Sequence, residues 1–346
     1  MLQEITTSQP AVSFCISTYK RTDYLQKQLE AIRQQTIPDW EVIVSDNDAE
    51  NHSAKQVVES FEDSRFRYLS NNENLGMVKS FNRSLAHATG RFVVMLTDDD
   101  PVYPAILETL LDLERQHPGY GMYMGSHDTY YEKLWLSHLA NRSPGIYSGL
   151  ANLEIGAVRE FSADIFLREF CTADFGGGIL WSSGMVKREI AQAMGGVPDY
   201  GTPFLSDAAY LILAGSQNGA VFTNTAVGCQ TIHGSNYSYA NSNYSYLEIA
   251  PRAFHEFIVR ELKLQSNSED MGVLNKYIGQ TLTTYFIFLK RVLDLSNTTN
   301  ESFTNSIRNI YSWSIMRKWH MKYKIGVKFP ELFKLAVQFK KVVLPK

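Results

Sequence analysis

Strand-like and helix-like segments alternate through the first hundred residues, and few architectures accommodate that order. Apolar, β-branched runs predict strands, and apolar residues recurring every three or four positions predict helices. The strands are expected at residues 12–16, 41–45, 66–69 and from Phe92 onward, with helices at residues 24–35, 54–61 and 77–88 between them. A β-α-β-α-β-α-β order predicts an α/β fold, in which a mostly parallel sheet is flanked by helices on both faces.

The strand expected from Phe92 ends in three consecutive acids, Asp98, Asp99 and Asp100, which we call the acidic triplet. Carboxylates this close repel one another and resist desolvation, so they are costly at the end of a buried strand unless a cation or a donor-rich ligand binds them. Oxygen ligands favour Mg²⁺ or Mn²⁺, which often complete their coordination with substrate phosphates. The triplet therefore predicts a hard-metal site, and the alternative is a solvated acidic turn before Pro101.

Polar residues also follow two other expected strands, at positions 17–19 and 46–48. In an open parallel sheet, ligands bind beyond the carboxyl ends of the strands. We therefore expect these two segments and the acidic triplet to converge on one crevice.

Length and composition exclude several classes of protein. A chain of 346 residues that is 44% hydrophobic can form one large domain with an appendage, or two domains. No run of eighteen apolar residues and no basic leader followed by an apolar stretch is present, so we expect neither export nor a membrane-spanning helix. Three widely separated cysteines argue against a disulfide framework or a zinc cluster and indicate a cytoplasmic protein.

The net charge of −3 conceals an uneven distribution. Residues 303–346 hold ten Lys or Arg and one acid, Glu331, whereas the rest of the chain holds 23 basic and 35 acidic residues. This distribution predicts an acidic body with a strongly basic tail.

Five motifs in the first 110 residues identify a family. They are VSFCISTYKR at 12–21, QQT at 34–36, WEVIVSDN at 40–47, NLG at 74–76 with Asn82, and LTDDD at 96–100. In order and spacing they resemble the family 2 glycosyltransferases of the GT-A fold, of the bacterial polysaccharide and glycan biosynthesis type. The resemblance continues more weakly to about Ser238.

The resemblance implies a GT-A catalytic domain over residues 1–250, with a nucleotide-binding half at 1–110 and an acceptor half at 111–250. Helical patterns beyond Pro251 predict a C-terminal helical region over residues 251–346 that ends in a basic amphipathic tail. Family members of this type transfer a sugar from a nucleotide-diphosphate sugar to an acceptor hydroxyl, with inversion at the anomeric carbon.

By resemblance, Ser17, Thr18, Tyr19 and Asp46 would hold the nucleoside. Tyr19 would lie near the base, and Asp46 would accept a hydrogen bond from the pyrimidine or the ribose. An aromatic ring and a carboxylate beyond adjacent strand ends supply the stacking face and the acceptor that this requires. Alternatively, Tyr19 packs on the first helix and Asp46 caps the next one.

The acidic triplet corresponds to the family's DXD motif, in which one carboxylate faces the ribose or a water and another binds a Mn²⁺ or Mg²⁺ that bridges both phosphates. Many relatives carry an acid where this chain has Thr97, so the pair is either Asp98 with Asp100 or Asp99 with Asp100. We expect Asp100 to be the most direct ligand. His233 matches a downstream family histidine that reaches the metal or the diphosphate, although an isolated histidine is more often structural.

An inverting displacement needs a base within hydrogen-bonding distance of the acceptor hydroxyl. The family supplies an acid at the start of a helix, after a Gly-Gly turn. Here Gly195 and Gly196 form that turn and Asp207 takes the base position, while Ser206 replaces the customary Glu. The alternative is that Asp207 only caps the following helix, expected at residues 207–217.

Four further predictions concern the rims of the site. Lys79 and Arg83 could contact phosphate, although their i, i+4 spacing equally suits a solvated helix face. Residues 176–178 are glycines that, with Trp181, could line the sugar and acceptor pocket. For Trp181, core packing is an equal alternative.

Beyond Pro330, apolar residues recur at helical spacing with lysines mostly outside that stripe. Such a segment is typical of membrane interfaces, so we expect contact with the inner leaflet and a saccharide or lipid-linked saccharide as acceptor, but no nucleic acid. The alternative is a helix packed on the catalytic domain or on a second subunit.

Two other enzyme classes are disfavoured because residues 17–21 contain no glycine. Nucleotidyltransferases and Rossmann dehydrogenases both use a glycine-rich phosphate loop after the first strand. A non-catalytic protein that binds sugar nucleotides or carbohydrate remains an alternative, since Thr97 and Ser206 replace two customary acids.

Overall fold

The computed structural model describes residues 9–133, 135, 137, 153–172, 179–233, 236, 244–295 and 300–330. The chain forms two compact units. The first comprises Met1–Thr129, Tyr147–Phe170 and Asp174–Thr231, and the second comprises Tyr130–Ile146, Cys171–Ala173 and Ile232–Lys346. These units are defined by packing, so the functional division at residue 250 stays a prediction.

One eight-stranded sheet has the order β3-β2-β1-β4-β7-β5-β8-β6. Four strands on one side are parallel, namely β1 (Val12–Thr18), β2 (Trp40–Asp46), β3 (Phe66–Ser70) and β4 (Phe92–Thr97). The other strands are β5 (Met122–Tyr131), β6 (Val158–Phe161), β7 (Gly184–Lys187) and β8 (Ala220–Ile232). Strand β7 runs antiparallel to both β4 and β5, and β6 runs antiparallel to β8. The α/β fold with a mostly parallel sheet is confirmed.

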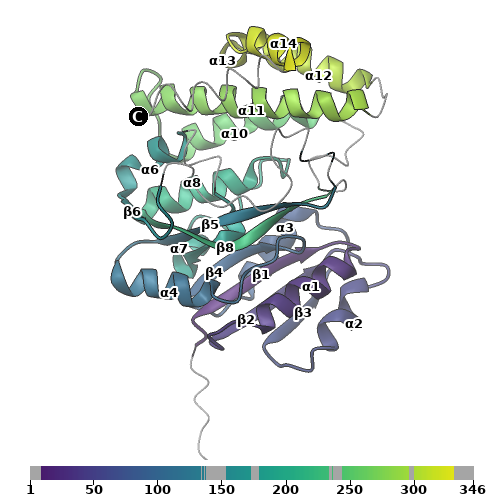
Figure 1. The fold of residues 1–346 in the computed structure, drawn as a ribbon, viewed down its shortest axis with the longest axis vertical. Coiled ribbons are helices and arrows are strands. Elements are labelled where there is room, and N and C mark those ends of the chain that lie inside the picture. Colours follow the sequence, from purple (N-terminus) through teal and green to yellow (C-terminus); the bar gives the residue numbers. More distant parts are fainter. Residues whose placement is uncertain are drawn as a thin grey trace, which may run out of the picture. The chain divides into compact units, whose positions relative to one another are not determined.

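Helices cover both faces of the parallel strands (Figure 1). The helices α1 (Thr22–Arg33), α2 (Ser53–Glu59) and α4 (Ile106–Gln116) pack with alternate strand residues such as Phe14 and Val44 in one apolar core. Helix α3 (Met77–Ala86) packs on β1 and β2, and its Ser84 meets the Cys15 side chain, which points to the opposite face of β1 from Phe14. Both faces of β1, β2 and β4 are buried, so these strands are mostly apolar, whereas the edge strand β3 is only partly buried.

The first unit continues with the helices α6 (Ala163–Phe170), α7 (Arg188–Ala193) and α8 (Ser206–Asn218), and with one 3₁₀ turn, η1 (Trp181–Ser183). A close approach requires glycine at position 196. The backbone there has φ +79°, and a Cβ would lie 2.2 Å from Asn82 Oδ1. The Asn82 amide donates to the Val197 carbonyl (2.9 Å) and accepts from the Val197 N–H (2.7 Å), so it joins α3 to the turn that leads to α8.

The second unit contains α10 (Tyr246–Glu261), α11 (Glu269–Leu295), α12 (Glu301–Ser312), α13 (Ser314–Arg317) and α14 (His320–Lys328). Asn300 caps α12 by accepting a hydrogen bond from the Phe303 N–H at 2.9 Å. The Trp319 ring packs so closely on Gly279 of α11 that a Cβ there would lie 1.9 Å from the ring nitrogen. These helices confirm the predicted C-terminal helical region, although α10 begins before residue 251, at Tyr246.

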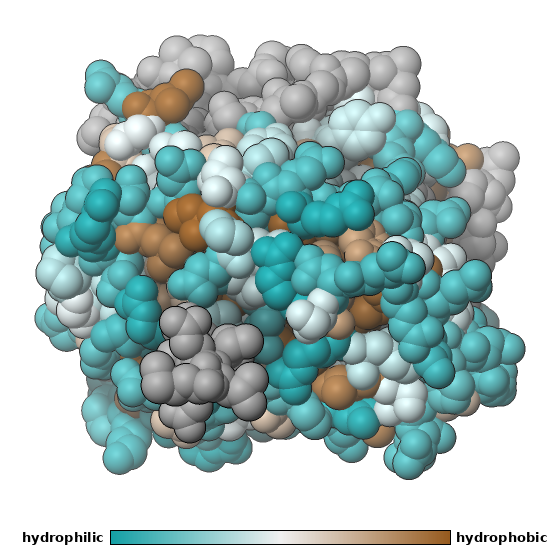
Figure 2. All heavy atoms as spheres, turned by 90° about the horizontal axis from the view of Figure 1, so that it is seen from below, coloured by the Kyte–Doolittle hydropathy of each residue, from teal (hydrophilic) through white to brown (hydrophobic). Residues whose placement is uncertain are grey.

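In the described part of the chain, no helix combines the length and apolar character needed to cross a bilayer. The face of the molecule in Figure 2 is mostly hydrophilic, with small apolar patches between polar side chains. Scattered apolar patches of this kind are ordinary on folded proteins.

Candidate active site

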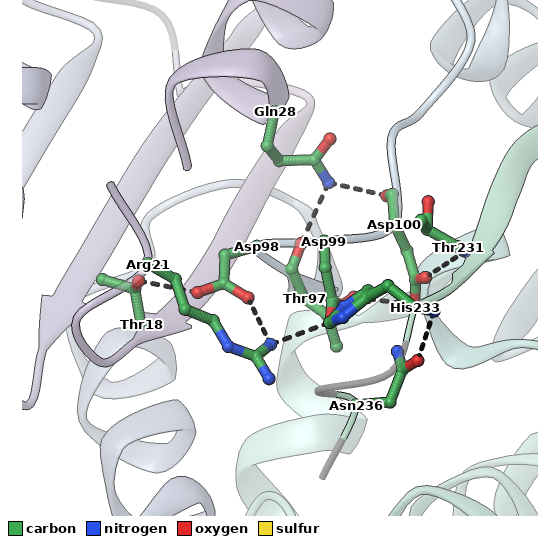
Figure 3. A network of polar contacts seen from close by, with 10 residues as sticks. All are labelled: Thr18, Arg21, Gln28, Thr97, Asp98, Asp99, Asp100, Thr231, His233 and Asn236. Carbon is green, nitrogen blue, oxygen red and sulfur yellow. Dashed lines mark hydrogen bonds and ion pairs between the residues drawn. The ribbon is translucent and has the colours of Figure 1, made fainter. Parts of the chain in front are cut away.

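The acidic triplet follows directly on β4, and all three residues are buried (Figure 3). The last residue of β1, Thr18, and Arg21 in the loop that follows both contact it. The Thr18 hydroxyl donates to Asp98 Oδ2 at 2.7 Å, and Arg21 Nη1 donates to Asp98 Oδ1 at 3.3 Å and to Asp99 Oδ2 at 2.8 Å. One guanidinium group therefore bridges two carboxylates, which reduces their mutual repulsion.

Asp100 is held from two other directions. Its Oδ1 accepts from the Thr231 N–H of β8 at 2.9 Å, and its Oδ2 accepts from the Thr97 hydroxyl at 2.8 Å. The Gln28 side chain of α1 donates to the Thr97 and Asp100 carbonyls, at 3.0 and 2.8 Å. The Thr97 hydroxyl thus orients the Asp100 carboxylate.

Burial raises the pKa of Asp98, and the neighbouring Asp99 charge adds to this effect, while Arg21 and Thr18 oppose it. Burial also raises the pKa of Asp100, again with Asp99, against the hydrogen bonds from Thr231 and Thr97. Both carboxyl groups therefore hold protons more tightly than ordinary aspartates. A bound cation would reverse this shift, because it favours the ionised form.

A hard divalent cation fits the chemistry of these side chains, since every potential metal-ligand atom in the side chains of the triplet is an oxygen. Asp98 and Asp100 each keep lone pairs beyond the hydrogen bonds they accept. Within the described residues, however, no group of three or more His, Cys, Asp or Glu is arranged as a complete metal site. A cation held by two carboxylates would complete its coordination with ligand phosphates or water.

On the nucleoside side, Tyr19 is 45% exposed and leaves an aromatic face open to stacking. The Lys20 ammonium lies 5.2 Å from the centre of that ring and 3.8 Å from Asp48 Oδ1. Thr18 is buried against Asp98, and Ser17 is partly buried. The end of β1 therefore connects the acidic triplet to an exposed aromatic ring.

Asp46 is fully buried at the end of β2. Its carboxylate accepts from the Asp48 N–H (2.9 Å), from the Ala54 N–H in the first turn of α2 (3.1 Å) and from the Tyr68 hydroxyl (3.1 Å). These bonds match the capping alternative. A contact with a nucleoside would require them to rearrange, so that role of Asp46 stays a prediction.

The two cations predicted on α3 differ in their surroundings. Arg83 donates to the Ser70 carbonyl at 2.6 Å and to the Asn71 side chain, so it is part of the structure of the first unit. Lys79 is exposed, and no hydrogen bond or ion pair joins it to the described residues. These two bonds of Arg83 use Nη1 alone, so contact of either cation with a phosphate stays a prediction.

Trp181 is 5% exposed and packs edge-on against Phe81 and Tyr210, with ring centres 4.7 and 6.4 Å apart. This arrangement matches the core-packing alternative. The predicted glycine segment at 176–178 lies outside the described residues.

Asp207 lies in the first turn of α8 and is exposed to solvent. Its Oδ1 accepts from the neighbouring Ala208 N–H at 2.8 Å, while Leu205 occupies the N-cap position in the left-handed region, with φ +68°. Although the Asp207 side chain reaches solvent, desolvation by the surrounding protein raises the pKa of its carboxyl. The hydrogen bond from the Ala208 N–H opposes this shift. A raised pKa suits a group that accepts a proton near neutral pH.

Ser206, which replaces the customary acid, is fully buried, and its hydroxyl donates to the Thr202 carbonyl at 3.3 Å. It therefore shapes the turn before α8. His233 belongs to the second unit and is buried. Its backbone N–H donates to Asn236 Oδ1 at 2.7 Å (Figure 3). Its role as a metal or diphosphate ligand stays a prediction.

With this geometry established, comparison with known proteins identifies the first part of the chain. Residues 13–175 match the model of Glycosyl transferase family 2. This segment is a family 2 glycosyltransferase domain. The predicted family resemblance is confirmed.

Two curated relatives are similar to part of the chain. The GalNAc(5)-diNAcBac-PP-undecaprenol beta-1,3-glucosyltransferase of Campylobacter jejuni is 32% identical over 120 residues, which are 34% of this chain and 38% of the relative. The UDP-Glc:alpha-D-GlcNAc-diphosphoundecaprenol beta-1,3-glucosyltransferase WfgD of Escherichia coli is 32% identical over 89 residues, or 26% of this chain and 35% of the relative. The chain thus aligns with little more than a third of the length of either enzyme.

Solved structures confirm the GT-A fold over nearly the whole chain. The S. aureus TarS 1–349 complex with UDP-GlcNAc superposes with a TM-score of 0.62 at 15% identity and covers 92% of this chain and 91% of TarS 1–349. The mannosyltransferase PcManGT from Pyrobaculum calidifontis, in complex with GDP-Man and Mn²⁺, gives a TM-score of 0.53 at 14% identity, covering 94% of this chain and 88% of that one. At this level of identity the likeness concerns the fold alone.

Proposed function

We propose that this protein transfers a glycosyl group from a nucleoside-diphosphate sugar to an acceptor hydroxyl, with inversion and with the aid of Mn²⁺ or Mg²⁺. One observation carries the proposal. The acidic triplet ends a parallel strand of a family 2 glycosyltransferase domain, and residues from β1, β8 and the N-terminus of α1 hold it in place. Such an edge of a parallel sheet is where ligands of α/β proteins bind.

For the donor, we assign the nucleoside to Ser17, Thr18, Tyr19 and Asp46. The exposed ring of Tyr19 supports this assignment, because it offers a stacking face next to the loop that contacts Asp98. Lys79, exposed on α3, would contact the diphosphate. Asp98 and Asp99 would line the donor site, where one carboxylate would face the ribose or a water.

Asp98 and Asp100 would hold the cation, with His233 as the third predicted ligand. When bound, a divalent cation stabilises the negative charge of the departing diphosphate. Thr97 and Thr231 fix the orientation of Asp100, and the Arg21 guanidinium offsets the negative charge of the other two carboxylates.

For the chemical step, we assign Asp207 as the general base. It takes the proton of the acceptor hydroxyl while that oxygen bonds to the anomeric carbon and the bond from this carbon to the diphosphate oxygen breaks. Its exposure and its raised pKa support the assignment, since a base must meet the acceptor and still bind a proton near neutral pH.

For the acceptor, we propose a saccharide linked to a lipid diphosphate. The names of the Campylobacter and Escherichia relatives include a saccharide linked to diphosphoundecaprenol (PP-undecaprenol in the first), which supports this choice. UDP-sugars are the first donors to test, because WfgD is named for UDP-Glc and TarS was solved with UDP-GlcNAc.

The test begins with a thermal-shift screen of the intact chain against UDP-, dTDP-, GDP- and CDP-sugars, with and without Mn²⁺. A ligand that binds only the folded state at one hundred times its Kd stabilises it by about 2.7 kcal/mol. The donor that raises the melting temperature then enters an assay of nucleotide release, in wild type and in Asp207→Asn. Asp199→Asn is the matched control, as an exposed acid in the loop before α8.

We expect Asp207→Asn to bind the donor and to lose release at least a hundredfold, a loss typical of removing a general base, while Asp199→Asn stays near wild type. Equal release in both variants would refute Asp207 as the base. Donor binding without nucleotide release in the wild type would instead support the non-catalytic sugar-nucleotide-binding protein.

A further inference from the structure

Helix α14 carries a row of exposed apolar side chains. Met321 is 64% exposed, Ile325 45% and Phe329, directly after the helix, 45%. They are spaced four residues apart, so they lie along one side of the helix. Large apolar side chains in such a row are unusual on a surface that faces only water.

The opposite side of α14 is already used for packing within the second unit. Tyr323 and Gly326 are buried there, and the Tyr323 ring lies 5.3 Å from that of Tyr311 on α12. Trp319, just before the helix, packs against Gly279 of α11. The helix is therefore fixed to its neighbours by one side, and the exposed row is not needed for its attachment.

Within residues 302–330, which include this row, the formal charges are all positive, and the next acid along the chain is Glu331. Residues 302–330 contain six Lys or Arg and no Asp or Glu: Arg308, Arg317, Lys318, Lys322, Lys324 and Lys328. Arg317, Lys318, Lys324 and Lys328 are exposed. The pKa of His320 is lowered by burial and by the Lys324 charge, so this histidine adds no charge near neutral pH. On the adjacent α11, Asp294 is ion-paired with Lys290.

We propose that residues 317–329, the α14 surface, bind the surface of an anionic lipid bilayer. Met321, Ile325 and Phe329 enter the acyl boundary, and the flanking lysines meet lipid phosphates, as in amphipathic helices that lie in the membrane plane. A soluble polyanion would use the cations but would gain nothing from the three apolar side chains. The combination therefore favours a bilayer.

The intact chain is tested by co-sedimentation with phosphatidylcholine vesicles and with vesicles in which about one third of the lipid is phosphatidylglycerol, enough to give a negative surface potential. The decisive variant combines Met321→Ser, Ile325→Ser and Phe329→Ser. Its control combines Tyr130→Ser, Ile155→Ser and Val158→Ser, which replace three other exposed apolar residues at 49, 84 and 40% exposure.

We expect wild type and control to sediment with the anionic vesicles only, and the α14 variant to bind at least tenfold more weakly. A second pair of variants isolates the contribution of charge. The double variant Lys324→Glu with Lys328→Glu should bind anionic vesicles about twenty-fold more weakly or worse, since each basic residue near the surface contributes about fivefold in affinity. Lys27→Glu with Lys55→Glu, two exposed lysines of the first unit, should change little.

Unchanged vesicle binding of the Ser variant would overturn the proposal, as would wild type that fails to bind anionic vesicles. If wild type and Ser variant bind the vesicles with equal affinity, and soluble polyphosphate displaces both equally, the α14 surface would instead be assigned to a soluble polyanion. All variants change exposed residues, so their melting temperatures should match wild type. Vesicle binding requires no donor, so this result and the transferase test stand separately.

Discussion

At the scale of single residues, Arg21 determines the electrostatics of the acidic triplet. Its side chain is 29% exposed and ion-paired with Asp98 and Asp99, which are 6 and 9% exposed. Without any bound cation, Arg21 therefore supplies part of the positive charge that such a cation would provide. This guanidinium and the hydrogen bonds from Thr18, Thr97 and Thr231 partly cancel the repulsion within the triplet.

Replacing Arg21 with Gln should have opposite effects on the free and the metal-bound protein. Without metal, loss of a charged hydrogen-bonding partner should cost about 1–3 kcal/mol of unfolding free energy. With Mn²⁺, the more negative triplet should bind the cation more tightly, so Mn²⁺ should raise the melting temperature more than in wild type. Thermal denaturation with and without Mn²⁺ measures both, and Arg33→Gln, an exposed arginine on the same helix, is the control. An equal or smaller Mn²⁺ effect would contradict this role.

At the scale of elements, the turn that leads into α8 determines how Asp207 is presented. Leu205 has φ +68°, a conformation that costs roughly 1–3 kcal/mol for a residue other than glycine. Neighbouring hydrogen bonds hold it: the Tyr200 hydroxyl donates to the Phe204 carbonyl at 2.9 Å, and the Ser206 N–H donates to the Pro203 carbonyl at 3.1 Å.

Tyr200→Phe removes one of these bonds and keeps the ring. We expect kcat of the proposed transfer to fall about tenfold, by analogy with small displacements of catalytic groups, while the donor Kd stays unchanged. Steady-state kinetics and donor titration separate the two effects. Tyr120→Phe, which removes an exposed hydroxyl bonded to Glu160 at 2.5 Å, is the control. Parallel losses of donor affinity and kcat would show general disruption instead of positioning.

Local sequence patterns predicted the elements of the parallel half well, because each strand and helix there has its own periodicity. They did not predict the antiparallel strands β5 to β8, which depend on pairing between distant segments. The same holds for the site. Asp98 and Asp100 were identified from their position after β4, but the partners Arg21 and Thr231 lie 77 and 131 residues away from them in sequence. Asn82 was noted as part of a motif, and only the structure gives its reason, the bonds to Val197.

At the scale of the whole molecule, acid stability depends on a carboxylate that joins three parallel strands. Glu41 on β2 accepts from the Ser13 hydroxyl of β1 at 2.7 Å and from Arg67 of β3 at 2.9 Å. The Thr89 N–H, just before β4, donates to it at 2.6 Å. Burial alone would raise the pKa of Glu41, but hydrogen bonds from Thr89, Ser13 and Arg67 outweigh burial and lower it.

A carboxyl with a lowered folded-state pKa stabilises the fold above its unfolded pKa of about 4.3 and loses that contribution as the pH falls through the folded value. Glu41→Gln should therefore reduce the unfolding free energy by about 1–3 kcal/mol at pH 7 and by less at pH 3. Urea unfolding at both pH values measures this. Glu59→Gln, at an exposed position, should differ from wild type at neither pH. A loss that is the same at pH 3 and pH 7 would rule out the charged form as its source.

The two hydrogen bonds of the Asn82 side-chain amide couple helix α3 to the turn before α8. It binds both the N–H and the carbonyl of Val197, so α3 cannot move away from the turn before α8 without breaking two bonds at once. Lys79 sits on that same helix, one turn earlier. If the donor diphosphate binds Lys79 as proposed, its binding would also restrain the segment that leads to Asp207, the proposed base.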